Sequence, residues 1–209
     1  MKILELFSGT HSIGKEFEEC EVISVDNDNK FKPTHLCDIL EFDYKKYSNN
    51  YFDYIHASPP CIMYSQTQIS MYNRKKRHNV TGEMIIWNKQ IHEELMKISD
   101  KLVLKTLEII EYFKPKYWTI ENPFHNNWNN IRKRDFMKNF DYTIVNYCMY
   151  NYPVAKPTII FNNFNLDLKR CDKKHKHSNW DNFSRNIYER YKIPSDLVKE
   201  IKRQIQMSL

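Results

Sequence analysis

Cys61 ends the most distinctive stretch of the sequence, Phe-Asp-Tyr-Ile-His-Ala-Ser-Pro-Pro-Cys at residues 52–61. Tyr54, Ile55 and Ala57 indicate a buried strand. The two prolines after it stiffen the chain, because each fixes its own φ and restricts the residue before it. Open α/β sheets bind ligands at the carboxyl ends of their strands, so this thiol is aimed at a candidate ligand site. The simpler alternative is a half-buried thiol after a rigid turn.

Glu121 is the second candidate, because it follows another apolar run, Tyr117-Trp118-Thr119-Ile120, and is fixed by Asn122-Pro123. A carboxylate at the end of a core strand is costly unless it has a partner or a chemical role. We therefore expect Glu121 to lie at the same edge of the sheet as Cys61.

A third set of residues has the pattern of a nucleotide-binding turn. Gly9 and Gly14 are two of only three glycines in the chain, and both follow the apolar strand that ends at Phe7. Asp26 ends the next strand, 17 residues after Gly9 (26 − 9), close to where such folds bind ribose hydroxyls. Asp38-Ile39 ends a third short strand and could bracket an adenine ring. Taken singly, these are ordinary turn glycines and solvated loop acids.

The order of apolar strands and helical stretches predicts one doubly wound α/β domain over residues 1–209. A chain of 209 residues, 41% hydrophobic, is long enough for one full core. It has no long apolar run and no signal-peptide pattern, so we expect neither membrane insertion nor secretion. Five cysteines without a C-x-x-C spacing favour free thiols in an intracellular, reducing compartment. The net charge of +6 allows a polyanionic partner.

Residues 62–82 are expected to form a long irregular loop, a kind of segment that is often functional. The loop carries Ser65 and the basic run Arg74-Lys75-Lys76-Arg77, and this run is either a phosphate contact or a solvated face. Residues 83–113 are expected to be helical with a break near Ser99-Asp100. Cys171, His175 and His177 have no usual zinc spacing and no evident fourth ligand, so no metal site is expected.

In this order the stretches resemble the motifs of the cytosine-C5 DNA methyltransferases, above all the compact phage-type and virus-type members. Residues 4–10 with Ile13-Gly14 are similar to the family's S-adenosyl-L-methionine (AdoMet) motif, and Pro60-Cys61 and Glu121-Asn122-Pro123 to its Pro-Cys and Glu-Asn motifs. Residues 147–150 and 156–158 and the stretch Tyr191-Lys192-Ile193-Pro194 resemble the later motifs.

The resemblance implies a DNA methyltransferase that uses AdoMet as cofactor and flips the target base out of the helix. It implies a covalent Cys61 adduct at C6 of cytosine, a Glu121 carboxyl group that binds the ring, and Lys156 as the nearby cation. Nucleic-acid contacts are assigned to Ser65, Arg74, Lys75, Lys76 and Arg77. The implied cofactor residues are Phe7, Ser8, Gly9, Thr10, Asp26, Asn27, Asp38, Ile39 and Pro59.

Three departures from the family pattern limit these expectations. His11 stands where many relatives have glycine, and the usual arginine motif is reduced to Val154-Ala155-Lys156, which leaves Lys156 as the only nearby cation. Only about thirty residues lie between the predicted hairpin, which ends at Phe161, and the last helix. This is too few for a full target-recognition domain, so a protein partner could supply the selectivity for the target sequence. RNA stays open as a substrate. The alternatives are an exocyclic-amino methyltransferase, which shares Ser58-Pro59-Pro60, and a non-catalytic AdoMet-binding scaffold on nucleic acid.

Overall fold

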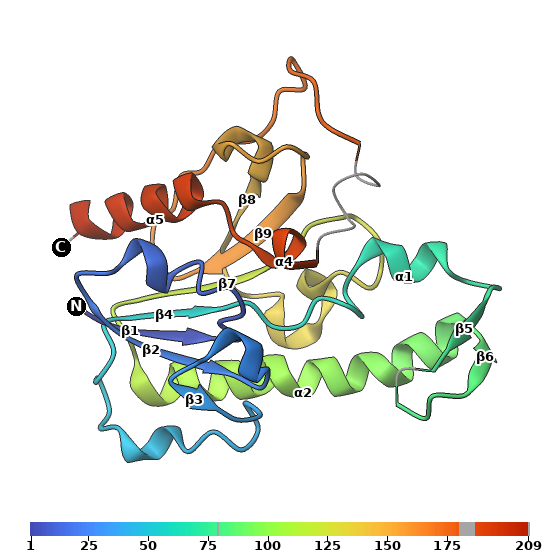
Figure 1. Ribbon diagram of the computed structural model, residues 1–209, viewed down its shortest axis with the longest axis horizontal. Coiled ribbons are helices and arrows are strands. Elements are labelled where there is room, and N and C mark those ends of the chain that lie inside the picture. Colours follow the sequence, from blue (N-terminus) through green and yellow to red (C-terminus); the bar gives the residue numbers. More distant parts are fainter. Residues whose placement is uncertain (79, 180–186, 209) are drawn as a thin grey trace.

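The computed structural model describes residues 1–78, 80–179 and 187–208. Within these residues seven strands form one sheet in the order β3-β2-β1-β4-β7-β9-β8 (Figure 1). The first five in that order run parallel, and β9 is antiparallel to both of its neighbours. The strands are β1 Lys2–Leu6, β2 Glu21–Asp26, β3 His35–Leu36, β4 Tyr54–Ala57, β7 Tyr117–Pro123, β8 Tyr142–Asn146 and β9 Pro157–Asn162.

Successive side chains of a strand point to opposite faces of the sheet, so the apolar residues form two cores, one on each face. Leu4 and Ile55 pack with α2 (Lys89–Phe113), whereas Ile3 and Tyr54 pack with α5 (Ser195–Met207). Figure 1 shows the two helices on opposite sides of the sheet. This arrangement confirms the predicted α/β fold class. The other helices are α1 Gln66–Ser70 and α4 Ile187–Tyr191, with 3-10 turns η1 Gly14–Glu16, η2 Asn29–Phe31, η3 Tyr44–Lys46, η4 Ile131–Lys133, η5 Asp135–Met137 and η6 Tyr147–Tyr150.

Two expectations about residues 62–113 are wrong. The segment after Cys61 is not an irregular loop, because it contains α1 and an antiparallel hairpin of β5 (Lys75–Arg77) and β6 (Met84–Ile86). α2 is one unbroken helix of 25 residues. Asp100 does not break it, because its carboxylate accepts hydrogen bonds from Tyr64 and Arg134 and is thereby stabilised inside the protein.

The sheet reverses its strand order between β1 and β4. From β1 the chain builds outward through β2 and β3, and it then returns to pair β4 with the other edge of β1. Ligands of open α/β sheets bind at such a switch point, outside the carboxyl ends of the strands. Cys61, four residues after β4, lies on that side of the sheet. Among the described residues, no helix combines the length and apolar character needed to cross a membrane.

Candidate active site

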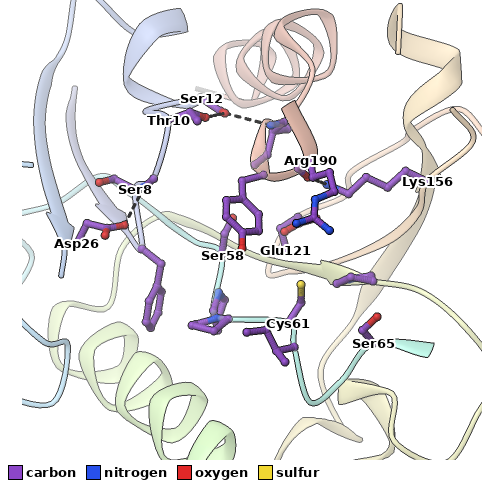
Figure 2. A pocket seen from close by; sticks show the side chains of 18 of the residues that line it. Ser8, Thr10, Ser12, Asp26, Ser58, Cys61, Ser65, Glu121, Lys156 and Arg190 are labelled. Carbon is purple, nitrogen blue, oxygen red and sulfur yellow. Dashed lines mark hydrogen bonds between the residues drawn. The ribbon is translucent and has the colours of Figure 1, made fainter. Parts of the chain in front are cut away.

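One large cavity of about 1000 Å³ opens at the carboxyl ends of β1, β2, β4 and β7. Residues from the β8–β9 connection and from α4 complete its wall. The sheet topology thus brings together side chains that lie more than a hundred residues apart in the chain (Figure 2). The expected site residues on its wall are Phe7, Ser8, Gly9, Thr10, Asp26, Asn27, Asp38, Ile39, Pro59, Cys61, Ser65, Glu121 and Lys156.

The turn after β1 is held by Asp26 from β2. Its Oδ2 accepts a hydrogen bond from the Gly9 amide at 2.8 Å and its Oδ1 from the Asp28 amide at 2.9 Å. Gly9 has φ of 44°, a left-handed conformation that glycine adopts without a Cβ penalty. Phe7 shares this region with φ of 55°, which is strained for an aromatic residue. The strained turn therefore presents Phe7 and Ser8 to the cavity.

Glu5 holds the second half of the same turn. Its carboxylate accepts hydrogen bonds from the Ile13 and Gly14 amides at 3.0 and 3.2 Å, and burial raises the pKa of Glu5 to about 7. A Cβ added at Gly14 would lie 3.2 Å from Glu5 Oε2, so a larger residue would force the buried Glu5 carboxylate to shift by a few tenths of an ångström. His11 adopts a left-handed conformation with φ of 55°, and its Nε2 donates to the Phe31 carbonyl at 2.5 Å. The departure at His11 is therefore accommodated.

The nucleophile loop is tied directly to the strand that carries Glu121. Asn122 is fully buried, and its Nδ2 donates to the Pro59 carbonyl at 3.0 Å, two residues before Cys61. Proline has no backbone N–H, so the carbonyl oxygen is the group through which this Pro-Pro segment can be fixed. The bond sets the position of the Cys61 backbone relative to Glu121. Figure 2 shows the Cys61 sulfur directed into the cavity, below the Glu121 side chain.

Tyr147 is a partner of Glu121 that sequence reasoning missed. Its hydroxyl donates to Glu121 Oε1 at 2.9 Å in a buried setting. Burial and the Glu121 charge raise the pKa of Tyr147 well above its ordinary value, so the phenol stays protonated and remains a donor. The available signal was Tyr147 opening the stretch 147–150, but its aromatic character favours a core position equally well.

Two cations face Cys61, which corrects the expectation that Lys156 is the only one. Arg190 of α4 also lines the cavity, and Figure 2 shows its guanidinium directed toward Glu121 and Cys61. Arg190 Nε is buried without a hydrogen-bond partner among the described residues. Lys156 Nζ donates to the Arg190 carbonyl at 2.9 Å and lies 4.4 Å from the centre of the Tyr147 ring. Lys156 thus holds the end of α4 against the site.

The charges around Cys61 act on its pKa in opposite directions. Burial raises the pKa of the Cys61 thiol, and the nearby Glu121 charge raises it further, whereas Lys156 and Arg190 lower it. Burial likewise lowers the pKa of Lys156, and Glu121 and Cys61 oppose that shift. A thiolate at Cys61 consequently depends on the two cations.

His56 is a second buried polar residue that the sequence did not single out. It is 2% exposed in β4, and its ring nitrogens contact Thr119 Oγ1 at 2.8 Å and Ser58 Oγ at 3.0 Å. Burial lowers the pKa of His56 to about 3, so the imidazole is neutral. The ring therefore supports the turn into the nucleophile loop as a hydrogen-bonding group without charge.

The basic run at residues 74–77 lies outside the cavity, on the β5–β6 hairpin (Figure 1). Arg74, Lys75 and Arg77 are exposed. Lys76 points the other way, because its Nζ lies 3.9 Å from the centre of the Trp87 ring and donates to Gln68 Oε1 at 2.6 Å. Three of the four expected phosphate contacts are thus available to a partner, while Lys76 is engaged within the protein.

The sequence of the chain is similar to that of a viral protein. No protein-family model matches the chain. A probable DNA (cytosine-5)-methyltransferase from Frog virus 3 (isolate Goorha) is 32% identical over 152 residues, which are 72% of this chain and 64% of that protein. The chain therefore spans slightly less than two thirds of the relative's length. The predicted resemblance to cytosine-C5 DNA methyltransferases is confirmed by this relative.

A solved structure shares the fold at low sequence identity. A methyltransferase from Entamoeba histolytica aligns with a TM-score of 0.51 and 16% identity, over 85% of this chain and 57% of that one. A DNA modification methyltransferase described as putative, from an E. coli prophage, aligns with a TM-score of 0.48 and 16% identity, over 78% and 46% of the two chains. The Entamoeba structure supports the α/β fold class predicted from the sequence.

Proposed function

Because the chain is related to the cytosine-C5 DNA methyltransferases, we propose that it transfers a methyl group from AdoMet to C5 of cytosine in DNA through a covalent bond to Cys61. The observation that carries the proposal is the pairing of Cys61 and Glu121 across one cavity, fixed by the hydrogen bond from Asn122 to Pro59. The cofactor, the substrate and the roles of the site residues are all parts of this proposal.

The residues at the β1 and β2 ends of the cavity fit AdoMet. Both Asp26 oxygens hold backbone amides, and each keeps a second lone pair for a ribose hydroxyl. Ser8 Oγ is buried with no hydrogen-bond partner among the described residues, so a ligand's polar group would satisfy it. Phe7 and Ile39 offer apolar surface to an adenine ring, with Asp38 beside them. When bound there, AdoMet supplies an electrophilic methyl group on its sulfonium.

Cys61 and Glu121 would activate the cytosine ring. C5 of cytosine is a weak nucleophile until a thiolate adds to C6, which moves electron density to C5. The Glu121 carboxyl group would bind N3 and the exocyclic amine and stabilise the charge that develops on the ring. Tyr147 orients Glu121 through its hydroxyl. After methyl transfer, loss of the C5 proton to water would allow the Cys61 thiolate to leave.

Arg190 would take the place of the reduced arginine motif. Its guanidinium and the Lys156 ammonium favour the thiolate form of Cys61 by lowering the pKa of that thiol. The unpartnered Nε of Arg190 is a free donor for the flipped base or its phosphate. The proposal therefore assigns the cation of the site to α4, with Lys156 holding the helix end.

Covalent trapping tests the proposal. An oligonucleotide with 5-fluorocytosine, incubated with protein and AdoMet, should yield a complex stable to denaturant, since fluorine at C5 blocks the elimination that frees the enzyme. Cys61→Ser should abolish trapping, because an alcohol is a poor nucleophile at neutral pH without a dedicated base. Cys20→Ser changes a half-buried thiol that does not line the cavity and is the matched control that should still trap.

Each competing function gives a different result. N4-methylcytosine or N6-methyladenine without a trapped species would identify an exocyclic-amino methyltransferase. Binding of AdoMet without methylation of either DNA or RNA would identify a scaffold. Methylation that persists undiminished in Cys61→Ser would refute the proposed mechanism. An RNA substrate trapped in preference to DNA would keep the mechanism and replace the proposed substrate.

A further inference from the structure

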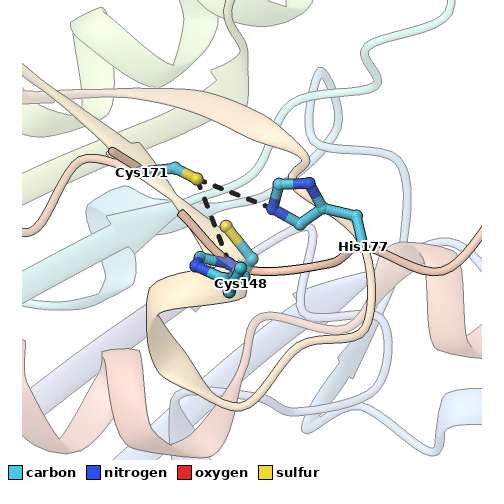
Figure 3. A group of neighbouring side chains, drawn as sticks. Cys148, Cys171 and His177 are labelled. Atoms are coloured by element: carbon cyan, nitrogen blue, oxygen red, sulfur yellow. Dashed lines mark hydrogen bonds between the residues drawn. The ribbon is translucent and has the colours of Figure 1, made fainter. Parts of the chain in front are cut away.

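Four potential metal ligands meet on the face of the molecule that carries η6. Cys148, Cys171, His175 and His177 place one ligand atom each within 4.8 Å of all the others. Cys171 Sγ lies 3.5 Å from His177 Nε2 and 3.9 Å from His175 Nε2 (Figure 3). Cys148 is the fourth ligand that the spacing Cys171-x-x-x-His175-x-His177 lacked, and it comes from 23 residues upstream (171 − 148).

These separations fit a tetrahedral zinc ion. With Zn–S of about 2.3 Å and Zn–N of about 2.0 Å, the ligand atoms of a tetrahedral site lie roughly 3.3 to 3.8 Å apart. The Cys171–His177 distance of 3.5 Å is already in that range, and a contraction of the 4.8 Å cluster by roughly 1 Å would close the site. Two thiols and two imidazoles suit zinc, and harder oxygen-seeking cations such as magnesium or calcium are disfavoured.

Ordinary packing does not account for this arrangement. Both histidines are exposed, and residues 171–179 form no regular secondary structure, so no hydrophobic core draws the imidazoles to the sulfur atoms. Two hydrogen bonds anchor the ends of the segment. The Cys171 amide donates to the side-chain oxygen Oδ1 of Asn146 at 3.0 Å, and the Ser178 amide donates to the Pro153 carbonyl at 2.8 Å. Between these anchors, the side chains of Cys171, His175 and His177 lie together with that of Cys148.

We propose that Cys148, Cys171, His175 and His177 bind a structural Zn²⁺ ion that fixes residues 171–178 against η6. Two thiolates balance the charge of the ion, and a closed set of four protein ligands leaves no position for a substrate, as in structural zinc sites. His177 and Ser178 also line the cavity, so the ion would hold part of the wall facing Cys61. The exposed lysines of the segment, Lys173, Lys174 and Lys176, would then be held as a fixed basic surface.

Metal analysis of the full chain tests the site. Protein purified under reducing conditions without chelator should contain about one zinc ion per chain, as measured by inductively coupled plasma mass spectrometry. Cys171→Ser and His177→Asn should lose the ion, and His177 is exposed, so its replacement leaves the core intact. Cys20→Ser and Cys37→Ser are matched controls, because these half-buried thiols lie outside the cluster and should leave zinc content unchanged.

Two further measurements keep the test independent of activity. Co²⁺ exchanged into the site should give the thiolate-to-metal charge-transfer absorption of a Cys-ligated ion, and this absorption should vanish in Cys148→Ser. Hydrogen exchange across residues 171–178 should accelerate when a chelator removes the ion. Wild-type protein that holds no zinc after incubation with Zn²⁺ and dialysis would overturn the proposal. Equal zinc in all the variants, or a Cys148–Cys171 disulfide in reducing buffer, would overturn it as well.

Discussion

Replacing Tyr147 by phenylalanine removes one oxygen atom from the site and leaves the buried ring in place. The lost group is the hydroxyl that donates to Glu121 Oε1 at 2.9 Å. The pKa of Tyr147 is raised by burial and by Glu121, so this group is a neutral donor throughout the working pH range. The substitution therefore tests whether the orientation of Glu121 matters for methyl transfer.

The expected size of the effect follows from the type of bond. A hydrogen bond to a charged group contributes about 1.5 to 3 kcal/mol. If that free energy is expressed in the transition state, kcat should fall by about 10-fold to about 150-fold, since about 1.4 kcal/mol corresponds to a factor of ten. The Tyr147 hydroxyl donates to Glu121, which is not one of the proposed cofactor residues, so the Kd for AdoMet should stay unchanged.

Steady-state transfer of tritiated methyl groups to DNA gives kcat, and calorimetry gives the Kd for AdoMet. Tyr142→Phe is the matched control, because Tyr142 lies on β8 with 43% of its surface exposed and lines no part of the cavity. Its kcat should equal that of the wild type. Full activity and full 5-fluorocytosine trapping in folded Tyr147→Phe would refute the positioning role. A loss confined to AdoMet affinity would refute it too.

Replacing Arg74, Lys75 and Arg77 with glutamine should flatten the salt dependence of DNA binding by about 0.9 per lost duplex contact, and an unaltered slope would leave the hairpin a solvated surface. Asp26→Ala should weaken AdoMet by about 1 to 3 kcal/mol, because it removes the acceptor that holds the cofactor turn, and calorimetry on the folded variant measures this. Burial lowers the pKa of His56 from 6.5 to about 3. Between these pH values the imidazole is neutral in the folded protein and protonated in the unfolded chain. The resulting stability is present above pH 6.5 and is lost as the pH falls toward 3, at up to about 1.4 kcal/mol per pH unit. His56→Gln should remove that part of the slope from urea unfolding curves, and an identical slope would contradict the assigned shift.

The residues at strand ends could be located from the sequence because local patterns specify them. Apolar runs stop at Phe7, Asp26, Ala57 and Glu121, and parallel strands bring their carboxyl ends to one edge of the sheet. The order of these runs was therefore enough to assemble the cavity around Gly9, Cys61 and the acids.

What escaped prediction depends on contacts between distant segments. Arg190 reaches the cavity because distant residues hold α4 there, Lys156 at the Arg190 carbonyl and Tyr152 at the Glu189 carbonyl. Nothing local to Tyr-Glu-Arg-Tyr at 188–191 signals this. Cys148 joins the two histidines through the fold of β8 and η6 and not through spacing. Residues 62–82 have no local pattern that predicts their structure. They are held by a hydrogen bond from the Trp87 indole to the Gln68 carbonyl, and the hairpin separates these two residues in the sequence.

The continuous α2 helix limits how the molecule can enclose a substrate. A helix of 25 residues is a stiff rod roughly 37 Å long, and β6 runs directly into its first turn. The buried Trp87 clamps the junction, since its indole N–H donates to the Gln68 carbonyl at 2.8 Å and its amide to the Arg74 carbonyl at 3.0 Å. The hairpin is therefore fixed to the start of α2. A substrate that reaches the hairpin would therefore meet, outside the cavity, a surface that moves only together with α2.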